Sequence, residues 1–189
     1  MKKPCFLLFL TVIQSFCLLV NSQDLQFYRE DIVFKVNEEV VVTDACYHFC
    51  NIGEKEIRTA LFYPFPENTM MLVDSLVITD LKTNQVISHR EGKSGVFFGI
   101  LVKAYGQSAY RVYFRQRLAE KKFKYILTST ENWGRSLEFA NFELQVPVYL
   151  TIDSLSYPPD TSFIKNEIQF YQWKKKDMMP DRDFEVEFH

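Results

Sequence analysis

The chain has 189 residues and a formal net charge of −2, so no overall positive field favours nucleic acid or an anionic membrane surface as its partner. Its 18 Phe and 10 Tyr supply the aromatic side chains that are common in β-sheets. No repeat of fixed period, low-complexity tract or linker rich in Pro, Gly or Ser divides the chain, which favours one domain with one core.

The first 22 residues have the features of a signal peptide. Lys2 and Lys3 precede an apolar run from residue 5 to residue 20, and cleavage is expected before Gln23. We therefore expect export to the periplasm or the extracellular space, and one mature β-sandwich domain of residues 23–189 without a transmembrane span. Its net charge is about −4, because the leader holds two lysines and no acid. A retained membrane anchor is the alternative, although the apolar run is short for a span.

Short segments with alternating apolar residues follow one another along the rest of the chain, and turn-forming residues separate them. Strands are expected at residues 32–36, 40–51, 57–65, 70–79, 86–89, 96–102, 110–118, 123–127, 142–152, 168–172 and 184–188. A helical period is missing throughout. These features predict an all-β fold, an antiparallel, immunoglobulin-like β-sandwich of about eight to ten strands.

Three of these segments carry specific expectations. In residues 40–51 the face with Tyr47 and Phe49 is expected in the core. Residues 142–152 alternate over their whole length, which predicts one long strand. Residues 110–127 predict a hairpin whose inner face packs against that strand.

A basic strip is the first candidate binding site. It comprises residues 111–124, with Glu120 as its single acid. Arginine pairs bidentately with carboxylate, phosphate or sulfate groups, and a tyrosine among the arginines adds a stacking surface. The strip therefore predicts docking of an anionic glycan or an acidic envelope protein, unless acids on neighbouring strands, for instance Glu143, neutralise it. The side chains expected to bind are Arg111, Tyr113, Arg115, Arg117, Lys122 and Lys124.

Trp133 is the second candidate. It lies in a polar segment, residues 128–135, that is rich in turn formers and is expected at a surface corner. An exposed Trp can stack on the apolar face of a sugar ring, whereas a buried one would close the end of the sandwich. The sequence leaves both interpretations open.

Cys46, His48 and Cys50 are weak candidates for a metal site, because residues two apart share one face of a strand. The two thiols are expected roughly 13 Å apart on an extended strand, too far for one tetrahedral ion or an internal disulfide. We therefore expect no metal and no cofactor. Free thiols are the first interpretation, and a disulfide enabled by a bulge or by a second chain is the next.

Standard catalytic motifs are missing: the chain has no Gly-rich phosphate loop, no His-Glu-x-x-His and no nucleophile elbow. A non-enzymatic module that binds or scaffolds at the cell envelope, with an anionic or carbohydrate ligand, is the leading interpretation. The alternative is a secreted hydrolase or thiol-dependent enzyme that uses His48 with Cys46 or Cys50. A subunit that assembles through edge strands is a third possibility.

Several turn and strand signatures carry a resemblance to a known group of proteins. They are residues 47–53, 63–66, 113–116, 125–128, 133–134 and 180–183. From about residue 40 to its end the chain resembles uncharacterised exported bacterial proteins with an immunoglobulin-like β-sandwich. The resemblance implies that fold and export, and it implies no catalytic residue.

Overall fold

The computed structural model describes residues 24–67 and 72–189, and nearly all the regular structure in them is β-strand. The expected signal peptide lies outside the described residues. Within them, no helix is long and apolar enough to cross a membrane. The strands are β1 (Leu25–Val36), β2 (Val40–Asn51), β3 (Ile57–Pro64), β4 (Val73–Asp80), β5 (Gln85–Ile87), β6 (His89–Glu91), β7 (Gly95–Val102), β8 (Gln107–Arg117), β9 (Lys122–Tyr125), β10 (Leu137–Pro147), β11 (Ile152–Leu155), β12 (Thr161–Lys165), β13 (Ile168–Met178) and β14 (Phe184–Phe188). A 3₁₀ helix, η2 (Thr128–Trp133), follows β9.

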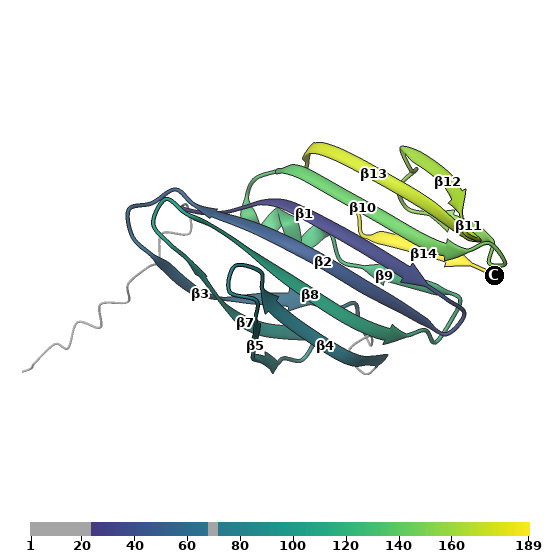
Figure 1. Cartoon of the computed structure of the whole chain (residues 1–189), viewed down its shortest axis with the longest axis horizontal. Helices are drawn as coiled ribbons and strands as arrows, with labels where there is room; N and C mark the ends of the chain where they lie inside the picture. The colour runs from purple at the N-terminus through teal and green to yellow at the C-terminus, as the bar shows by residue number, and fades with distance from the viewer. Residues whose placement is uncertain (1–23, 68–71) are drawn as a thin grey trace, which may run out of the picture.

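The strands form two layers (Figure 1). One layer is an eight-stranded sheet, called the large sheet below, in the order β12-β13-β10-β1-β2-β8-β4-β5. Two three-stranded sheets, β11-β14-β9 and β3-β7-β6, lie against its inner face. The second layer of the sandwich is therefore divided, and β9 and β3 are edge strands of its two parts.

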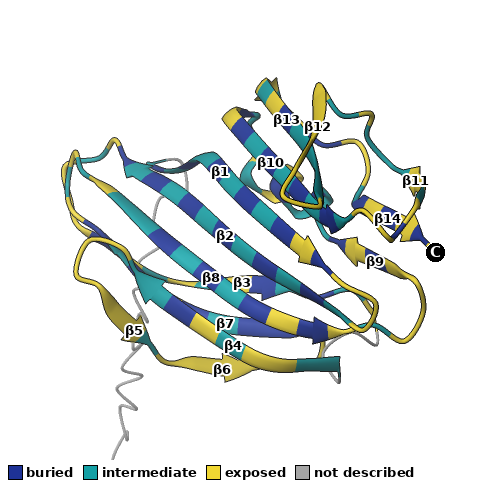
Figure 2. Ribbon diagram, turned by 45° about the vertical axis from the view of Figure 1, so that its right-hand side comes forward, coloured by how far each residue is buried: buried dark blue, intermediate teal, exposed yellow. Residues whose placement is uncertain are grey.

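Strand β2 shows why this sequence builds a sandwich. It spans the predicted residues 40–51, and its buried and half-buried positions alternate along its whole length, as they do on its neighbours in Figure 2. Tyr47 and Phe49 face the core as predicted, with 8% and 2% of their surface exposed. The alternation arises because successive side chains of a strand point to opposite faces.

The all-β sandwich predicted from the sequence is confirmed, and two details differ. The described residues form 14 strands, more than the eight to ten expected, because several segments that join the longer strands are themselves short strands. The pair β1 and β10 is parallel, with Ile32 opposite Phe142, whereas every other strand pair among the described residues is antiparallel. An immunoglobulin-like topology is not confirmed.

The long strand predicted at residues 142–152 is wrong in its second half. Strand β10 ends at Pro147, which has no N–H for a ladder, and Leu150 N–H bonds back to the Pro147 carbonyl in a turn. Ile152 then begins β11 in another sheet. The apolar alternation continues because Leu150 is buried in the turn itself, at 8% exposure.

The hairpin predicted at residues 110–127 is also wrong. Strand β8 pairs with β2 on one edge and with β4 on the other, so no edge is left for β9. The residues between β8 and β9 instead carry the chain to the opposite layer, where β9 pairs with β14. Tyr110 and Phe114 of β8 and Phe123 and Tyr125 of β9 still face the core, and buried side chains from all three sheets form one hydrophobic cluster.

Candidate ligand-binding cavity

A cavity of about 730 Å³ lies on the inner face of the large sheet. Its walls come from β1 and β2 of the large sheet, from β3, β7 and β9 of the two smaller sheets, and from η2. It therefore lies where the second layer is divided. Its size is within the range of about 300–1,000 Å³ that is usual for small-molecule sites.

Glu30 lines this cavity because β1 contains a β-bulge. Before the bulge Phe27 faces the core, and after it Glu30 and Ile32 do, so the buried positions change from odd to even. The register with β2 shifts between Phe27 and Arg29, where the extra residue is accommodated. A bulge turns the following side chains to the opposite face. In a regular strand this acidic residue would point to solvent.

The environment of Glu30 is unusual for a carboxyl group. Only 2% of the residue is exposed, and its Oε1 has no hydrogen-bond partner among the described residues. Burial, together with the nearby charge of Asp31, raises the pKa of Glu30 to about 8. The group is therefore mostly protonated at neutral pH, and it keeps unused hydrogen-bonding capacity beside the cavity.

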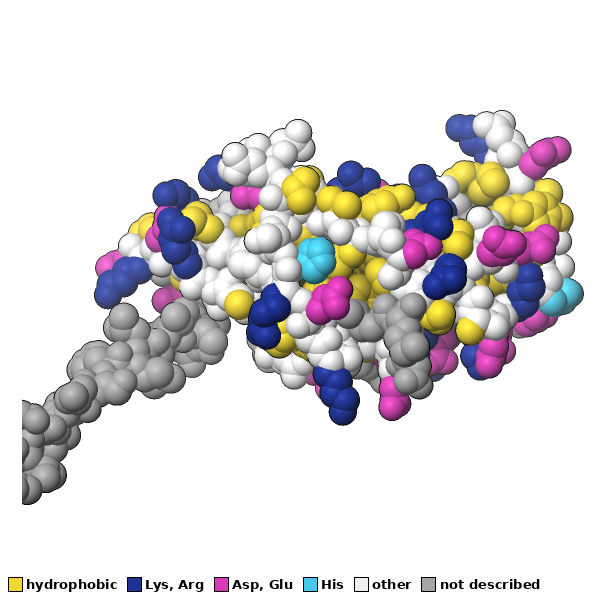
Figure 3. All heavy atoms as spheres, turned by 90° about the horizontal axis from the view of Figure 1, so that it is seen from below, with side chains coloured by type: hydrophobic (Ala, Val, Ile, Leu, Met, Phe, Trp, Pro, Cys, Tyr) yellow, Lys and Arg dark blue, Asp and Glu magenta, His cyan; other side chains and the backbone are white. Residues whose placement is uncertain are grey.

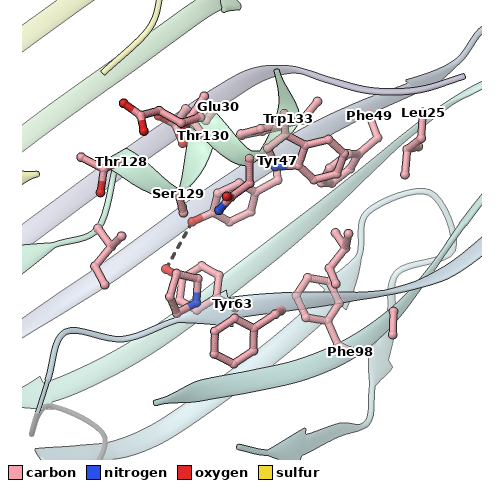
Figure 4. A pocket seen from close by; sticks show the side chains of 18 of the residues that line it. Leu25, Glu30, Tyr47, Phe49, Tyr63, Phe98, Thr128, Ser129, Thr130 and Trp133 are labelled. Carbon is pink, nitrogen blue, oxygen red and sulfur yellow. Dashed lines mark hydrogen bonds between the residues drawn. The ribbon is translucent and has the colours of Figure 1, made fainter. Parts of the chain in front are cut away.

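Three tyrosine hydroxyls meet in the same cavity. The Tyr47 hydroxyl donates to the Tyr63 hydroxyl at 3.2 Å and also contacts the Tyr125 hydroxyl. Figure 4 shows Tyr47 and Tyr63 approaching from β2 and β3. Burial is the main cause that raises the pKa of each tyrosine, so all three stay neutral at physiological pH. The cluster ties the large sheet to both smaller sheets and offers polar atoms within an aromatic wall.

Phe27, Phe49 and Trp133 form an aromatic triad in the wall. The ring centroids of Phe27 and Phe49 lie 5.3 Å apart. The Trp133 ring centroid lies 5.6 Å from the Phe27 centroid and 5.5 Å from the Phe49 centroid. Trp133 is half-buried, so it is neither a fully exposed platform nor a buried plug. It packs on the core with part of its surface and lines the cavity with the rest (Figure 4).

Helix η2 holds Trp133 in this position. The Asp183 carboxylate accepts hydrogen bonds from Leu127 N–H, Thr128 N–H and the Thr128 hydroxyl at 3.2, 3.1 and 2.8 Å, which fixes the start of η2. Gly134 ends it in the left-handed conformation with φ of 64°, and its N–H donates to the Glu131 carbonyl. The polar segment that the sequence places at a corner thus borders the cavity.

The residues of the predicted basic strip are divided between the two layers. Arg111, Tyr113, Arg115 and Arg117 lie on the outer face of β8. Lys122 and Lys124 lie on the outward face of β9, in the opposite layer. Trp133 lies between the layers, in the cavity wall. Anion binding by these residues stays a prediction.

Carboxylates accompany most of these basic side chains. Arg111 forms a bidentate pair with Asp44 at 2.6 Å, and Arg115 forms one with Asp74 at 2.8–3.0 Å. On β9, Lys122 pairs with Glu120, and Lys124 pairs with both Asp183 and Glu185. Basic and acidic side chains are likewise interspersed over the face seen in Figure 3.

The expected pairing of the arginines with Glu143 is wrong. Glu143 lies on β10, which β1 and β2 separate from β8. It accepts hydrogen bonds from Gln145 and Gln172 instead, at 2.6 and 2.8 Å. The sequence could not assign these partners, because the strand order that separates them is a property of the whole sheet.

Cys46, His48 and Cys50 share the outer face of β2, away from the cavity, as their spacing predicts. His48 Nε2 lies 3.0 Å from Asp31 Oδ2, and the Cys50 thiol donates to Gln26 Oε1 at 3.4 Å. No hydrogen bond joins His48 to either cysteine in the part of the chain that is described. Across that part, no three His, Cys, Asp or Glu side chains are arranged to hold a metal ion.

Both thiols lack the activation that a thiol enzyme needs. Partial burial is the largest influence on each, and it raises the pKa of Cys46 and of Cys50. A nucleophilic cysteine instead has a lowered pKa and a base within hydrogen-bonding distance. The carboxylate beside His48 is also engaged, because Arg29 and Asn141 donate to Asp31 at 2.7–2.9 Å. These contacts do not favour the alternative enzyme built on His48.

We expect both cysteines of the described chain to be free thiols in the purified protein, as they are in the structure. Alkylation of denatured, non-reduced residues 24–189 should add two labels per chain, counted by mass spectrometry. The same protein reduced beforehand is the control and should give the same mass. A chain that takes up no label before reduction would contradict the expectation and would support a disulfide.

Sequence reasoning missed Glu30 and the tyrosine cluster. One signal for Glu30 is present in the sequence: apolar residues occupy odd positions at Leu25 and Phe27 but even positions from Ile32 onward. That change of parity indicates a bulge and places Glu30 on the inward face. The meeting of Tyr47, Tyr63 and Tyr125 has no local signal, because they belong to three different sheets.

Comparisons with known proteins identify the fold and no family. No family model matches the chain, and no curated protein matches it. A solved structure of a "putative nutrient binding protein" from Legionella pneumophila matches with a TM-score of 0.66 at 12% identity, covering 87% of this chain and 67% of the other. The M1 zinc metallopeptidase from Deinococcus radiodurans matches with a TM-score of 0.52 at 10% identity, covering 87% and 42%. A complex of a two-domain M1 zinc metallopeptidase with L-tryptophan matches with a TM-score of 0.53 at 10% identity, covering 87% and 43%.

At these identities the likeness concerns the β-rich fold alone. The chain spans about two thirds of the Legionella protein and less than half of the metallopeptidases. The expected family of exported bacterial sandwich proteins is thus supported only as a β-rich fold.

Proposed function

We propose that this chain is an exported, non-enzymatic binding module of the cell envelope, and that its ligand site is the cavity between the large sheet and η2. The observation that carries the proposal is an aromatic-walled space of about 730 Å³ that holds a buried carboxyl group, one oxygen of which has no hydrogen-bond partner among the described residues. Such a space, mostly apolar with a few polar groups in fixed positions, is typical of small-molecule sites.

Export is proposed from the sequence: Lys2, Lys3 and the apolar run that follows them have the pattern of a secretory leader. The likeness to a protein described as a nutrient binding protein supports a binding role within the same fold. An anionic glycan or an acidic envelope protein remains our proposal for the outer face of β8. Arg111 and Arg115 already pair with Asp44 and Asp74, so that surface is the second candidate after the cavity.

Filling the cavity should weaken ligand binding. Thr59 lies on the cavity side of β3, and Thr59→Phe places a ring in the space. We expect N-phenyl-1-naphthylamine, a neutral dye whose fluorescence rises in apolar surroundings, to bind the wild type with micromolar affinity. The Thr59→Phe variant should bind it at least about tenfold more weakly, because a cavity that is full cannot bury the dye. Fluorescence titration measures both affinities.

Thr83→Phe is the matched control, since Thr83 is exposed in the turn between β4 and β5, and this variant should bind as the wild type does. Thermal unfolding of all three proteins checks that each is folded. Absence of dye binding to the folded wild type would overturn the proposed site, and so would unchanged binding to folded Thr59→Phe.

A further inference from the structure

The carboxyl groups of the described residues that line the cavity face no basic side chain within that lining. Two carboxyl side chains line it, Glu30 within and Glu131 at its exposed rim. Among the described residues that line it there is no Lys, Arg or His. An anionic ligand would therefore find no positive partner among these residues, whereas a cation would find an acidic group that can take the opposite charge.

Glu30 has a buried oxygen for which the described residues provide no hydrogen-bond partner. Its Oε1 is buried and unpartnered in the described structure. A buried polar group without a partner carries an uncompensated desolvation cost. A ligand that brings an N–H donor to this oxygen removes that cost, and a cationic donor forms the stronger, charge-assisted bond.

The aromatic triad offers the second half of a cation site. Phe27 and Glu30 are three residues apart on β1, so their Cα atoms are at most roughly 10 Å apart along the strand. A short linker between an ammonium group and an aromatic ring spans much of this distance. Aromatic faces attract cations and also bury the apolar part of such a ligand.

We propose that the cavity binds organic cations, specifically amines with an aromatic or other apolar body, whose ammonium group pairs with Glu30 while the body packs against Phe27, Phe49 and Trp133. This inference rests on the proposed function, because it assigns a ligand class to the same cavity. Neutral and anionic small molecules bind there more weakly.

Binding of such an amine releases a proton. The free protein carries Glu30 mostly as the neutral acid at pH 7, and the ammonium ligand arrives already charged. The ion pair forms when the Glu30 O–H bond breaks and its proton passes to the buffer, while the ligand keeps all of its N–H bonds. About one proton therefore leaves for each amine bound.

The other titratable groups around Glu30 do not account for this proton. Tyr47 on β2, Tyr63 on β3 and Tyr125 on β9 have raised pKa values and stay neutral. Asp31, the next residue on β1, is on the opposite face; partial burial acts to raise its pKa, but hydrogen bonds from Arg29 and Asn141 outweigh that and lower it. Glu131 is exposed on η2.

Tryptamine and its alcohol analogue tryptophol test the inference, because they differ only in the ammonium group. At pH 7 we expect tryptamine to bind wild-type protein at least about tenfold more tightly than tryptophol, as a buried charge-assisted hydrogen bond requires. Isothermal titration calorimetry in phosphate and in Tris, which differ in ionisation enthalpy, should show release of close to one proton for tryptamine and none for tryptophol.

Glu30→Gln keeps the shape of the side chain and removes its charge. In this variant the preference for tryptamine should fall to within about threefold and the proton release should vanish, while tryptophol binds as before. Glu138→Gln is the control, since Glu138 is exposed on β10 and does not line the cavity, and it should behave as the wild type.

Equal affinity of the two compounds for the wild type, or tryptamine binding without proton release, would overturn the inference. If neither compound displaces N-phenyl-1-naphthylamine from the wild type, the inference is likewise overturned, yet the cavity remains a binding site because the dye occupies it. The proposed function fails separately, when the dye itself does not bind.

Discussion

Raising the pH from 5 to 8 destabilises the wild-type protein relative to its Glu30→Gln variant. The pKa of Glu30 is about 8 in the folded protein and near 4.5 when the group is exposed to water, so between these values the folded state holds a proton that the unfolded state has lost. Raising the pH over this range therefore favours unfolding. The relative loss is on the order of 3 kcal/mol, since each pKa unit corresponds to about 1.4 kcal/mol.

Urea denaturation of both proteins at pH 5, 6, 7 and 8 and constant ionic strength measures this loss. The neutral amide of Glu30→Gln does not titrate, whereas all other ionisable groups are common to the two chains and cancel in the difference. The free energy of unfolding of the variant should rise steadily relative to that of the wild type as the pH is raised from 5 to 8. If the free energies of unfolding of the two proteins change in parallel with pH, Glu30 is ionised or solvated in the folded state.

The same carboxyl group connects stability with binding. A buried acid without a partner in the described structure is costly to the fold, and such groups concentrate at functional sites. In the proposed complex the ammonium ligand provides the partner. An aromatic amine at saturating concentration should therefore stabilise the wild type more at pH 8 than at pH 6, because less proton release opposes binding at the higher pH.

Local patterns predicted individual strands well and their partners poorly. The alternation of Val40–Asn51 fixed both the strand and its inward face, since a half-buried strand has a period of two. The same rule failed at Leu150, where a buried turn residue continued the alternation beyond the end of β10. It also suggested a hairpin of β8 and β9, although both edges of β8 are occupied by β2 and β4.

The candidate site combines features with a local signal in the sequence and features that arise only from contacts between distant residues. Trp133 could be selected as a single unusual residue in a polar segment, but its neighbours Phe27 and Phe49 are distant in sequence. Glu30 could have been identified from the change of parity in β1, which is a local signal. The cavity itself could not, because it results from the division of the second layer into two sheets.

Phe34→Ala should destabilise the protein by about 3–5 kcal/mol, the range for removing a buried aromatic ring. Phe34 on β1 is fully buried, and its ring stacks on Phe184 of β14 with centroids 4.9 Å apart. It also packs against Phe123 and Tyr125 of β9 at 5.4 and 5.3 Å. This one side chain thus joins the large sheet to the sheet β11-β14-β9, and its loss leaves a void between the layers.

Urea denaturation compares this variant with Phe163→Ala on the edge strand β12, where the residue is 40% exposed and its ring stacks on Phe170 of the neighbouring strand β13. The control should lose no more than about 1 kcal/mol, because an exposed ring on an edge strand buries little area. The double variant Phe34→Ala, Phe184→Ala should be destabilised by less than the sum of the two single variants. The difference should be about 0.5–1.5 kcal/mol, since both single variants remove the same stacked pair. Equal losses for Phe34→Ala and Phe163→Ala would mean that the two layers are not held together through this contact.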